Sequence, residues 1–262
     1  MHGQGDAEIY RKKELLRDMR KALVVGGANG IGLSIAVSLA SRDDFETIYI
    51  VDRALPSEDV MHPKFDCHQF DLMSEDYSTF DMFTDIDTLM ITAGFGRLAL
   101  FKDLSEEHII SSMSVNSTAV MRIIHKFYGK LESSVDFYCG VMVSIAGFMS
   151  SPFFSVYGAS KAALKIFIES VNVELEKTGS SNRILNVSPG SIKGTSFNQG
   201  KTDLSQTSVL ASEIISHLEA KDDLFIPQYE EIFKNVLERY HADFRAEGRH
   251  SYNYKLNSGR IK

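Results

Sequence analysis

A chain of 262 residues with 44% hydrophobic and 24% charged side chains has the size and composition of one globular α/β domain. Its formal net charge of −7 argues against nucleic-acid binding, and no apolar run approaches the ~18 residues that a membrane span needs. The two cysteines, Cys67 and Cys139, lack metal-ligand spacing, so we expect no metal site. The N-terminus has no apolar core after its charges, which predicts no signal peptide and a reducing, cytoplasmic location.

The first predicted strand leads into a glycine-rich turn. Residues 1–20 are expected to form a polar helical extension outside a dinucleotide-binding catalytic domain of residues 21–228. Residues 21–25 predict a strand and residues 33–40 a helix, with G-G-A-N-G-I-G between them. Glycines permit a tight turn and close backbone approach, and the helix N-terminus favours a pyrophosphate. We therefore expect cofactor contacts at the turn from Gly26, Ala28, Asn29, Gly30, Ile31 and Gly32.

The second predicted strand, residues 47–51, is followed by Asp52. A carboxylate at this place can accept hydrogen bonds from the adenosine ribose and repels a 2′-phosphate. Asp52 therefore favours NAD over NADP, while Arg53 beside it keeps NADP possible.

Two further strands and a long helix follow. Residues 65–72 and 87–91 predict strands, and the segment between them is so short that we expect a truncated crossover helix. The second of these strands leads into T-A-G-F-G, whose small residues allow the backbone to approach a cofactor. Residues 104–130 predict a helix capped by Ser105, with Asn116, a poor helix former, in its middle.

Residues 141–164 carry the chemistry. An apolar run ends at Ser144, and Y-G-A-S-K then opens a helix on which Tyr157 and Lys161 share one face. A free phenol has a pKa of ~10, which a nearby ammonium lowers. We therefore expect Lys161 to lower the pKa of Tyr157, making it a general acid or base, while Ser144 donates a hydrogen bond to the substrate oxygen.

The second half continues the alternation of strands and helices. The helix extends to about residue 177, residues 183–188 predict a strand, and residues 195–208 are a polar segment. A helix over 209–219 and a short strand over 224–226 follow. Residues 229–262 are expected to form a helix to 246 and then a polar, basic tail, which could close over the pocket, contact a subunit or be partly disordered.

S-I-A-G followed by Y-G-A-S-K, with the earlier spacing Gly26-x-x-x-Gly30-x-Gly32, resembles the short-chain dehydrogenases/reductases over roughly residues 20–226. The resemblance implies a single doubly wound, Rossmann-type α/β domain with a mostly parallel sheet. It also implies that the polar segment near 195–208 is a lid over the substrate. It implies a catalytic set of Asn116, Ser144, Tyr157 and Lys161, with Asn116 at a local helix distortion holding a water that leads to Lys161. It also implies cofactor contacts from Asp52, Arg53, Asp71, Leu72, Ala93, Gly94, Tyr157, Lys161, Pro189, Gly190, Ile192 and Thr195.

Three features depart from the family pattern. Val25 stands where the family usually has Thr, and I-T-A-G stands where it usually has Asn-Asn-Ala-Gly. The chain also lacks the Asp-Gly-Gly turn near which most members end. These departures concern the bracing of the central sheet and the C-terminal segment.

We predict an NAD(P)-dependent oxidoreductase that transfers a hydride to or from a secondary alcohol or ketone. The substrate is expected to be largely apolar and to lie against Ser144, Tyr157, Phe95, Phe148, Phe154 and Phe197. The alternatives are an inactive cofactor-sensing or scaffolding protein of this fold, or a nucleotide-sugar epimerase or dehydratase. No nucleic-acid or membrane partner is expected, and apolar residues beyond the core-facing stripes of the helices at 105–130 and 157–177 predict a homotetramer.

Overall fold

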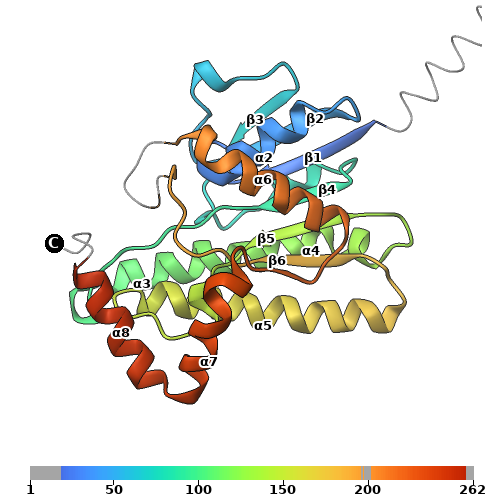
Figure 1. Ribbon diagram of the computed structural model, residues 1–262. Coiled ribbons are helices and arrows are strands. Elements are labelled where there is room, and N and C mark those ends of the chain that lie inside the picture. Colours follow the sequence, from blue (N-terminus) through green and yellow to red (C-terminus); the bar gives the residue numbers. More distant parts are fainter. Residues whose placement is uncertain (1–18, 196, 198–201, 258–262) are drawn as a thin grey trace, which may run out of the picture.

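The computed structural model describes residues 19–195, 197 and 202–257. In this part of the chain, seven strands form one sheet in the order β3-β2-β1-β4-β5-β6-β7, and every neighbouring pair is parallel (Figure 1). The strands are β1 (Arg20–Val25), β2 (Phe45–Asp52), β3 (Phe65–Gln69), β4 (Thr88–Ile91), β5 (Tyr138–Met142), β6 (Arg183–Val187) and β7 (Leu224–Phe225). The strand order reverses direction between β1 and β4, which confirms the predicted doubly wound fold.

Helices cover both faces of the sheet. They are α2 (Gly30–Ala40), α3 (Glu106–Met113), α4 (Ala119–Glu132), α5 (Ser155–Thr178), α6 (Leu204–Glu219), α7 (Lys234–Ala242) and α8 (Phe244–Asn257). Shorter turns are η1 (Glu58–Val60), η2 (Ser78–Met82), η3 (Phe101–Asp103), η5 (Ile145–Gly147) and the two π turns η4 (Ser114–Thr118) and η7 (Tyr229–Phe233). Among the described helices, none combines the length and the apolar character required to cross a membrane.

The core has two halves because side chains alternate across a strand. Leu23 points into the half that contains Ile123 of α4 and Ile168 of α5. Its neighbour Val24 points into the other half, with side chains of α2 and α6. Both residues are fully buried, as expected for a central parallel strand covered on both faces.

Several boundaries differ from the sequence prediction. Residues 1–18 of the expected extension lie outside the described residues, and Arg20 belongs to β1, where it binds Asp87 (Nε–Oδ1 3.1 Å) and Glu219 (2.6 Å). The truncated crossover is confirmed as the short turn η2. The helix α6 begins at Leu204, inside the expected lid, because Asp203 caps it by accepting from the Ser205 amide.

The two long helical predictions are both interrupted. The helix expected over 104–130 is capped by Ser105 as predicted, but it consists of α3, the π turn η4 and α4. The helix expected to end at 246 breaks at Asp243, and the expected polar tail instead forms α8.

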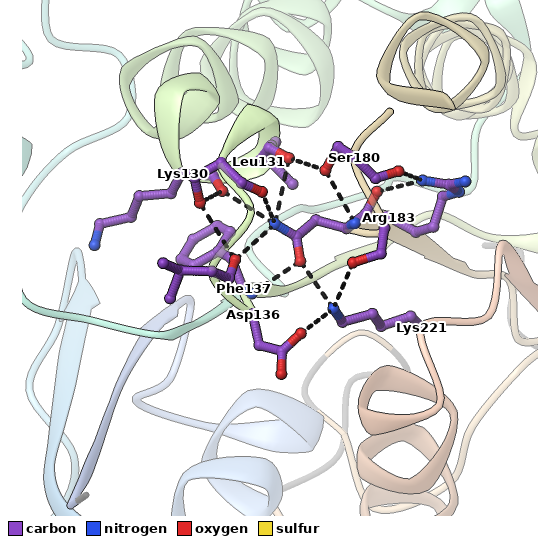
Figure 2. Close-up of polar contacts among 11 residues, drawn as sticks. Lys130, Leu131, Asp136, Phe137, Ser180, Arg183 and Lys221 are labelled. Carbon is purple, nitrogen blue, oxygen red and sulfur yellow. Dashed lines mark hydrogen bonds and ion pairs between the residues drawn. The ribbon is translucent and has the colours of Figure 1, made fainter. Parts of the chain in front are cut away.

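At the sheet edge opposite the strands' carboxyl ends, the buried side chain of Asn182 binds the connection between α4 and β5. Figure 2 shows the surrounding polar contacts, with Lys130, Phe137 and Lys221 labelled. The Oδ1 of Asn182 accepts from the Phe137 amide (3.0 Å) and from the Lys221 ammonium (2.9 Å), which also pairs with Asp136. Its Nδ2 lies within 3.3 Å of four backbone carbonyl oxygens, those of Lys130, Leu131, Ser133 and Val135. These bonds fix where β5 and β6 begin, and so fix the strands whose far ends lead to Ser144 and Pro189.

Candidate active site

The candidate site lies at the carboxyl edge of the sheet, where the loops after β1, β2, β4, β5 and β6 converge. Since all strands are parallel, every one of these loops leaves the same edge, on both sides of the reversal between β1 and β4. The sequence-predicted residues are distributed over these five loops, the turn after β3, the π turn η4 and the starts of α2 and α5.

The glycine turn after β1 is packed too closely for other side chains. Gly26 has φ +86°, and a Cβ on it would lie 2.4 Å from the backbone nitrogen of Ala93. A Cβ on Gly32 would lie 2.2 Å from the carbonyl oxygen of Gly26. Gly30 has φ +55° and lies beside Thr195. A side chain therefore does not fit at Gly26 or Gly32, and the predicted contact with a pyrophosphate stays a prediction.

The rest of the turn is fixed by side chains from distant segments. The Asp52 carboxylate at the end of β2 accepts from the Ala28 amide (3.0 Å), and Arg53 is exposed. The Gly30 amide donates to the hydroxyl of Thr202 (2.9 Å). Asn29 directly precedes α2, and the half-buried Ile31 packs against the core.

Asp71 and Leu72 follow β3 in different surroundings. The exposed carboxylate of Asp71 accepts from the Met73 amide (2.9 Å). Leu72 packs against the core, and its carbonyl accepts from the Tyr77 hydroxyl. These contacts belong to the turn itself, so the adenine contacts that the resemblance implies stay predictions.

Asn116 is brought to the loop after β4 by the π turn. Its buried amide accepts from the Phe95 N–H (2.9 Å) and donates to the Phe95 carbonyl (2.8 Å) and to Ser160 Oγ (3.1 Å). A Cβ on the exposed Gly94 would lie 3.2 Å from Asn116 Oδ1 and 3.3 Å from Lys161 Nζ. The expected helix distortion is therefore present, and it places Asn116 and Lys161 against the same glycine.

Ser144 lies close enough to Tyr157 to lower the pKa of the phenol through hydrogen bonding. Ser144 lies just beyond β5, where its Oγ also accepts from the Ala146 amide (3.1 Å). Tyr157 lies in the first turn of α5, half-buried. The strand end and the helix start thus bring a hydroxyl and a phenol together at the edge of the sheet.

The predicted effect of Lys161 on Tyr157 is wrong for this structure. Burial raises the pKa of Tyr157 to about 12, and its hydrogen bond with Ser144 lowers it only in part. The fully buried Lys161 donates to the Met142 carbonyl (2.8 Å), with Nζ 5.9 Å from the centre of the Tyr157 ring. Burial also lowers the pKa of Lys161 to about 7. The four-residue spacing predicts that the two side chains share a helix face. It gives no information on burial, whose effect on the pKa of Tyr157 outweighs that of the Lys161 charge.

The loop after β6 contacts both parts of the site. The Pro189 carbonyl accepts from the Ile145 amide (3.1 Å) next to Ser144. At its other end, Thr195 is buried beside Gly30 and donates to the Ile192 carbonyl (3.1 Å). At Gly190, a Cβ would lie 2.6 Å from the ring of Phe233, a residue that the sequence analysis did not select.

Two of the four predicted substrate-binding aromatics gather at Tyr157. Phe154 and Phe197 lie with ring centres 5.3 and 5.2 Å from Tyr157 and 5.9 Å from each other. Phe95 packs edge-on against His108. Phe148 follows η5, with its ring 5.1 Å from the Lys165 ammonium, and its predicted contact with the substrate stays a prediction.

Residues that the sequence analysis missed come from the C-terminal segment and from the end of β4. Tyr252 and Lys255 of α8 contact the turn that precedes Phe154. The Thr92 hydroxyl donates to the Val25 and Gly26 carbonyls (3.1 and 3.0 Å) and so braces the glycine turn. The departure from the family's Asn-Asn-Ala-Gly was the sequence signal that could have identified Thr92. The polar sequence of α8 gives no such signal for Tyr252 or Lys255. Among the described residues, no group of three or more His, Cys, Asp or Glu side chains could hold a metal ion.

Comparison with solved structures finds the same fold in other proteins. The chain is similar to a short-chain dehydrogenase/reductase from Burkholderia phymatum in complex with NAD (TM-score 0.72, 15% identity, 88% of this chain and 95% of that chain). It is also similar to a bulky-bulky ketone specific alcohol dehydrogenase from Comamonas testosteroni (TM-score 0.68, 21% identity, 88% and 95%). At these identities the likeness shows the fold alone.

Sequence comparison gives several curated relatives and the family. The chain is 29% identical over 169 residues to human 17-beta-hydroxysteroid dehydrogenase type 1, covering 58% of this chain but only 51% of the human protein. It is 25% identical over 205 residues to the probable short-chain type dehydrogenase/reductase VdlC of Helicobacter pylori (74% and 73%). Residues 20–205 match the family model described as short chain dehydrogenase, and the chain therefore belongs to the short-chain dehydrogenase family of nicotinamide-dependent oxidoreductases.

Proposed function

We propose that this chain transfers a hydride between NAD(H) and a secondary alcohol or ketone with a largely apolar body. The observation that carries the proposal is the meeting of Ser144, just after β5, with Tyr157 at the start of α5, where Lys161 shares the helix face and Phe154 and Phe197 lie beside the phenol. A hydroxyl and a phenol can hold one oxygen atom between them, and the two Phe rings would contact the apolar substituents of its carbon.

The described residues fit a nicotinamide cofactor. The cofactor supplies the hydride donor or acceptor, while the protein binds and orients it. Gly26 and Gly32 leave no room for a Cβ, and exposed Gly94 leaves an opening beside Lys161 that a larger side chain would fill. We assign the pyrophosphate to the glycine turn, the adenine end to Asp71 and Leu72, and the nicotinamide end to Ala93, Gly94 and the loop of Pro189, Gly190, Ile192 and Thr195.

Tyr157 is assigned the proton transfer. In the direction of ketone reduction, the phenol gives its proton to the carbonyl oxygen while the Ser144 hydroxyl donates a hydrogen bond to the same oxygen. A pKa of about 12 keeps Tyr157 protonated at neutral pH, so the proton is in place before reaction. Lys161, with a pKa of about 7, gains and loses a proton near neutrality, which suits a group that reloads Tyr157.

We assign Asn116 a positioning role. Its amide is bonded on both sides to the backbone of Phe95 and to Ser160, one residue before Lys161. It therefore supports the backbone on which a relay water and the nicotinamide would rest. A cofactor-sensing or scaffolding protein would need the glycine turn but not Asn116, Ser144, Tyr157 and Lys161 together, so the complete set favours an enzyme.

Asp52 supports NAD over NADP. Its carboxylate lies at the end of β2 and is held toward the glycine turn by the Ala28 amide. A 2′-phosphate at this place would meet a negative charge at short range. Arg53 is exposed and can turn toward a 2′-phosphate, but its attraction for that phosphate is opposed by the negative charge of Asp52.

The substrate assignment has support in the relatives' names. One is a hydroxysteroid dehydrogenase and one is specific for bulky-bulky ketones. The test is kcat/KM against hydroxysteroids, aryl ketones, polyols and free sugars, with NAD(H) and NADP(H) in parallel. Better turnover of polyols or sugars than of steroid-like or aryl ketones would refute the apolar assignment, and no turnover of any of them would refute the proposed reaction.

We also propose that the protein is a homotetramer. Ile166 and Val173 of α5 are 58% and 56% exposed, and their seven-residue spacing puts them on one face of the helix. Exposed apolar side chains in a row suit a helix face that packs on a second copy across a two-fold axis.

A further inference from the structure

The C-terminal helices α7 and α8 lie beyond the part of the chain that matches the family model. Figure 1 shows them at the end of α5 where that helix begins. Asp243 joins them and caps α8 by accepting from the Arg245 and Ala246 amides (2.9 and 3.0 Å). Arg239 of α7 pairs with the buried Glu247 of α8 (2.7 Å). The two helices therefore form one packed unit.

This unit contacts the turn of residues 150–154, which lies between Ser144 and Tyr157. The Lys255 ammonium donates to Ser151 Oγ (2.7 Å) and to the Pro152 carbonyl (2.8 Å). The ring of Tyr252, one helical turn earlier, stacks on Phe153 with centres 4.6 Å apart and planes at 29°. Both side chains reach the same turn from one face of α8.

The turn that they hold has an unfavourable backbone. Phe153 has φ +67°, a left-handed conformation that bulky residues rarely adopt. The residue is only 5% exposed, and its carbonyl accepts from the Ala99 amide (3.0 Å). A residue stays in this conformation only where surrounding contacts over-determine it, and Tyr252 and Lys255 supply such contacts.

The turn fixes the aromatic neighbour of the phenol. Phe154 directly follows Phe153, lies 5.3 Å from Tyr157 and has the Lys255 ammonium 5.5 Å from its ring centre. A shift of α8 would therefore shift the ring beside the reacting group.

We propose that Tyr252 and Lys255 are positioning residues that set substrate specificity. They hold the turn of residues 150–154 so that Phe154 forms a fixed wall beside Tyr157 for the apolar body of a ring-bearing ketone or alcohol. The proposal rests on the proposed function for its substrate, but the hold on the turn is a property of the protein alone.

The experiment compares Tyr252→Ala with Tyr252→Phe, which keeps the ring, and with Tyr254→Ala as a matched control. Tyr254 lies on the same helix and is 64% exposed. Amide hydrogen exchange over residues 150–157 should be faster in Tyr252→Ala and unchanged in the other two variants. The free energy of an aromatic pair of this kind corresponds to a factor of about three to ten in an equilibrium constant. The KM for aryl ketones should therefore rise by about that factor in Tyr252→Ala. The KM for small aliphatic ketones and the Kd of NAD(H) should stay within about twofold.

The outcomes separate the two proposals. If amide exchange over residues 150–157 is unchanged in Tyr252→Ala, then α8 does not restrain this segment, whichever substrate the enzyme uses. Equal rises in KM for aryl and small ketones, with faster exchange, overturn the specificity role. If the wild type turns over no ketone or alcohol, the proposed function fails and so does the specificity role, while the exchange result still decides the hold. If Tyr252→Ala does not fold, the same measurements are made on Lys255→Met, which removes the ammonium donor and keeps the aliphatic part of the side chain.

Discussion

A Cβ atom on Gly32 would lie 2.3 Å from the hydroxyl oxygen of Thr92. That hydroxyl donates to the carbonyls of Val25 and Gly26, so one side chain at the end of β4 ties the strand end, the glycine turn and the start of α2 together. In a chain with Val25 in place of the family's Thr and without the Asn-Asn pair, Thr92 supplies a brace at this point. The contact leaves no space for any residue larger than glycine at position 32.

Gly32→Ala is expected to abolish NAD(H) binding, because the new methyl group must displace Thr92 or the Gly26 carbonyl. Gly129→Ala is the matched control. Gly129 is exposed on α4 with nothing within 4 Å of a Cβ, so alanine there should raise the free energy of unfolding by roughly 0.5–1 kcal/mol. Titration calorimetry and denaturant unfolding measure both effects. Wild-type affinity for NAD(H) in Gly32→Ala would contradict the assignment of the glycine turn.

Tyr157→Phe is expected to abolish turnover and leave the Kd of NAD(H) nearly unchanged. The substitution removes only the phenol oxygen, which we assign to proton transfer, and keeps the ring packed between Phe154 and Phe197. Single-turnover stopped-flow absorbance of the reduced nicotinamide measures the hydride step directly. A rate close to that of the wild type would remove Tyr157 from the mechanism.

The burial of Lys161 predicts how stability depends on pH. Its pKa is about 7 in the folded chain, against 10.5 for a free lysine, so the unfolded chain binds more protons between these values. The free energy of unfolding should therefore rise with pH across that window, and the full penalty of the buried charge should apply below pH 7. Tyr157, with a raised pKa, acts in the opposite sense between pH 10 and about 12.

Lys161→Met should flatten the rise between pH 7 and 9.5, measured by denaturant unfolding of the protein without cofactor. An identical slope in wild type and variant would show that Lys161 is not the group responsible.

The Asp52 carboxylate predicts a preference for NAD(H) that a neutral side chain should weaken. Asp52→Asn keeps an oxygen that can accept from the Ala28 amide and removes the charge, whereas Asp52→Ala removes both. We expect Asp52→Asn to shift the ratio of kcat/KM for NADP(H) to that for NAD(H) by about tenfold, which corresponds to ~1.4 kcal/mol. A wild-type preference for NADP(H) would mean that Arg53 outweighs Asp52.

The exposed face of α5 predicts assembly. Ile166→Glu combined with Val173→Glu should convert the tetramer to smaller species, since charges in an apolar contact are costly to bury. Val135→Glu, at an exposed loop position that is 72% accessible, should leave the assembly intact. Sedimentation velocity at micromolar concentration separates the species. A wild-type monomer under these conditions would refute the proposed tetramer.

The parallel sheet and the order of its loops could be predicted from the sequence because buried parallel strands are apolar runs that end at glycine or polar residues. Ser144 and the glycine turn follow such runs, whereas Tyr157 and Lys161 were selected by their four-residue spacing at the start of a helix. α8 could not be predicted, because its buried side chains include the charged residues Glu247 and Lys255, which give no hydrophobic period. The direction of the Tyr157 pKa shift was not predictable either, because it depends on how deeply the folded chain buries both groups.

The π turn at Ser114–Thr118 makes the number of residues in this helical segment as important as their identity. A π turn carries one residue more than the α-helical turn it replaces. Deleting one residue would restore regular hydrogen bonding but rotate α3 by about 100° relative to α4. A chain so shortened could keep Val120, Ile123 and Phe127 against the sheet, or keep Asn116 against Phe95, but not both. Relatives that align without a gap through this segment are therefore expected to share its geometry. A one-residue deletion here predicts a different arrangement of the site, even in a relative that keeps all of the site residues.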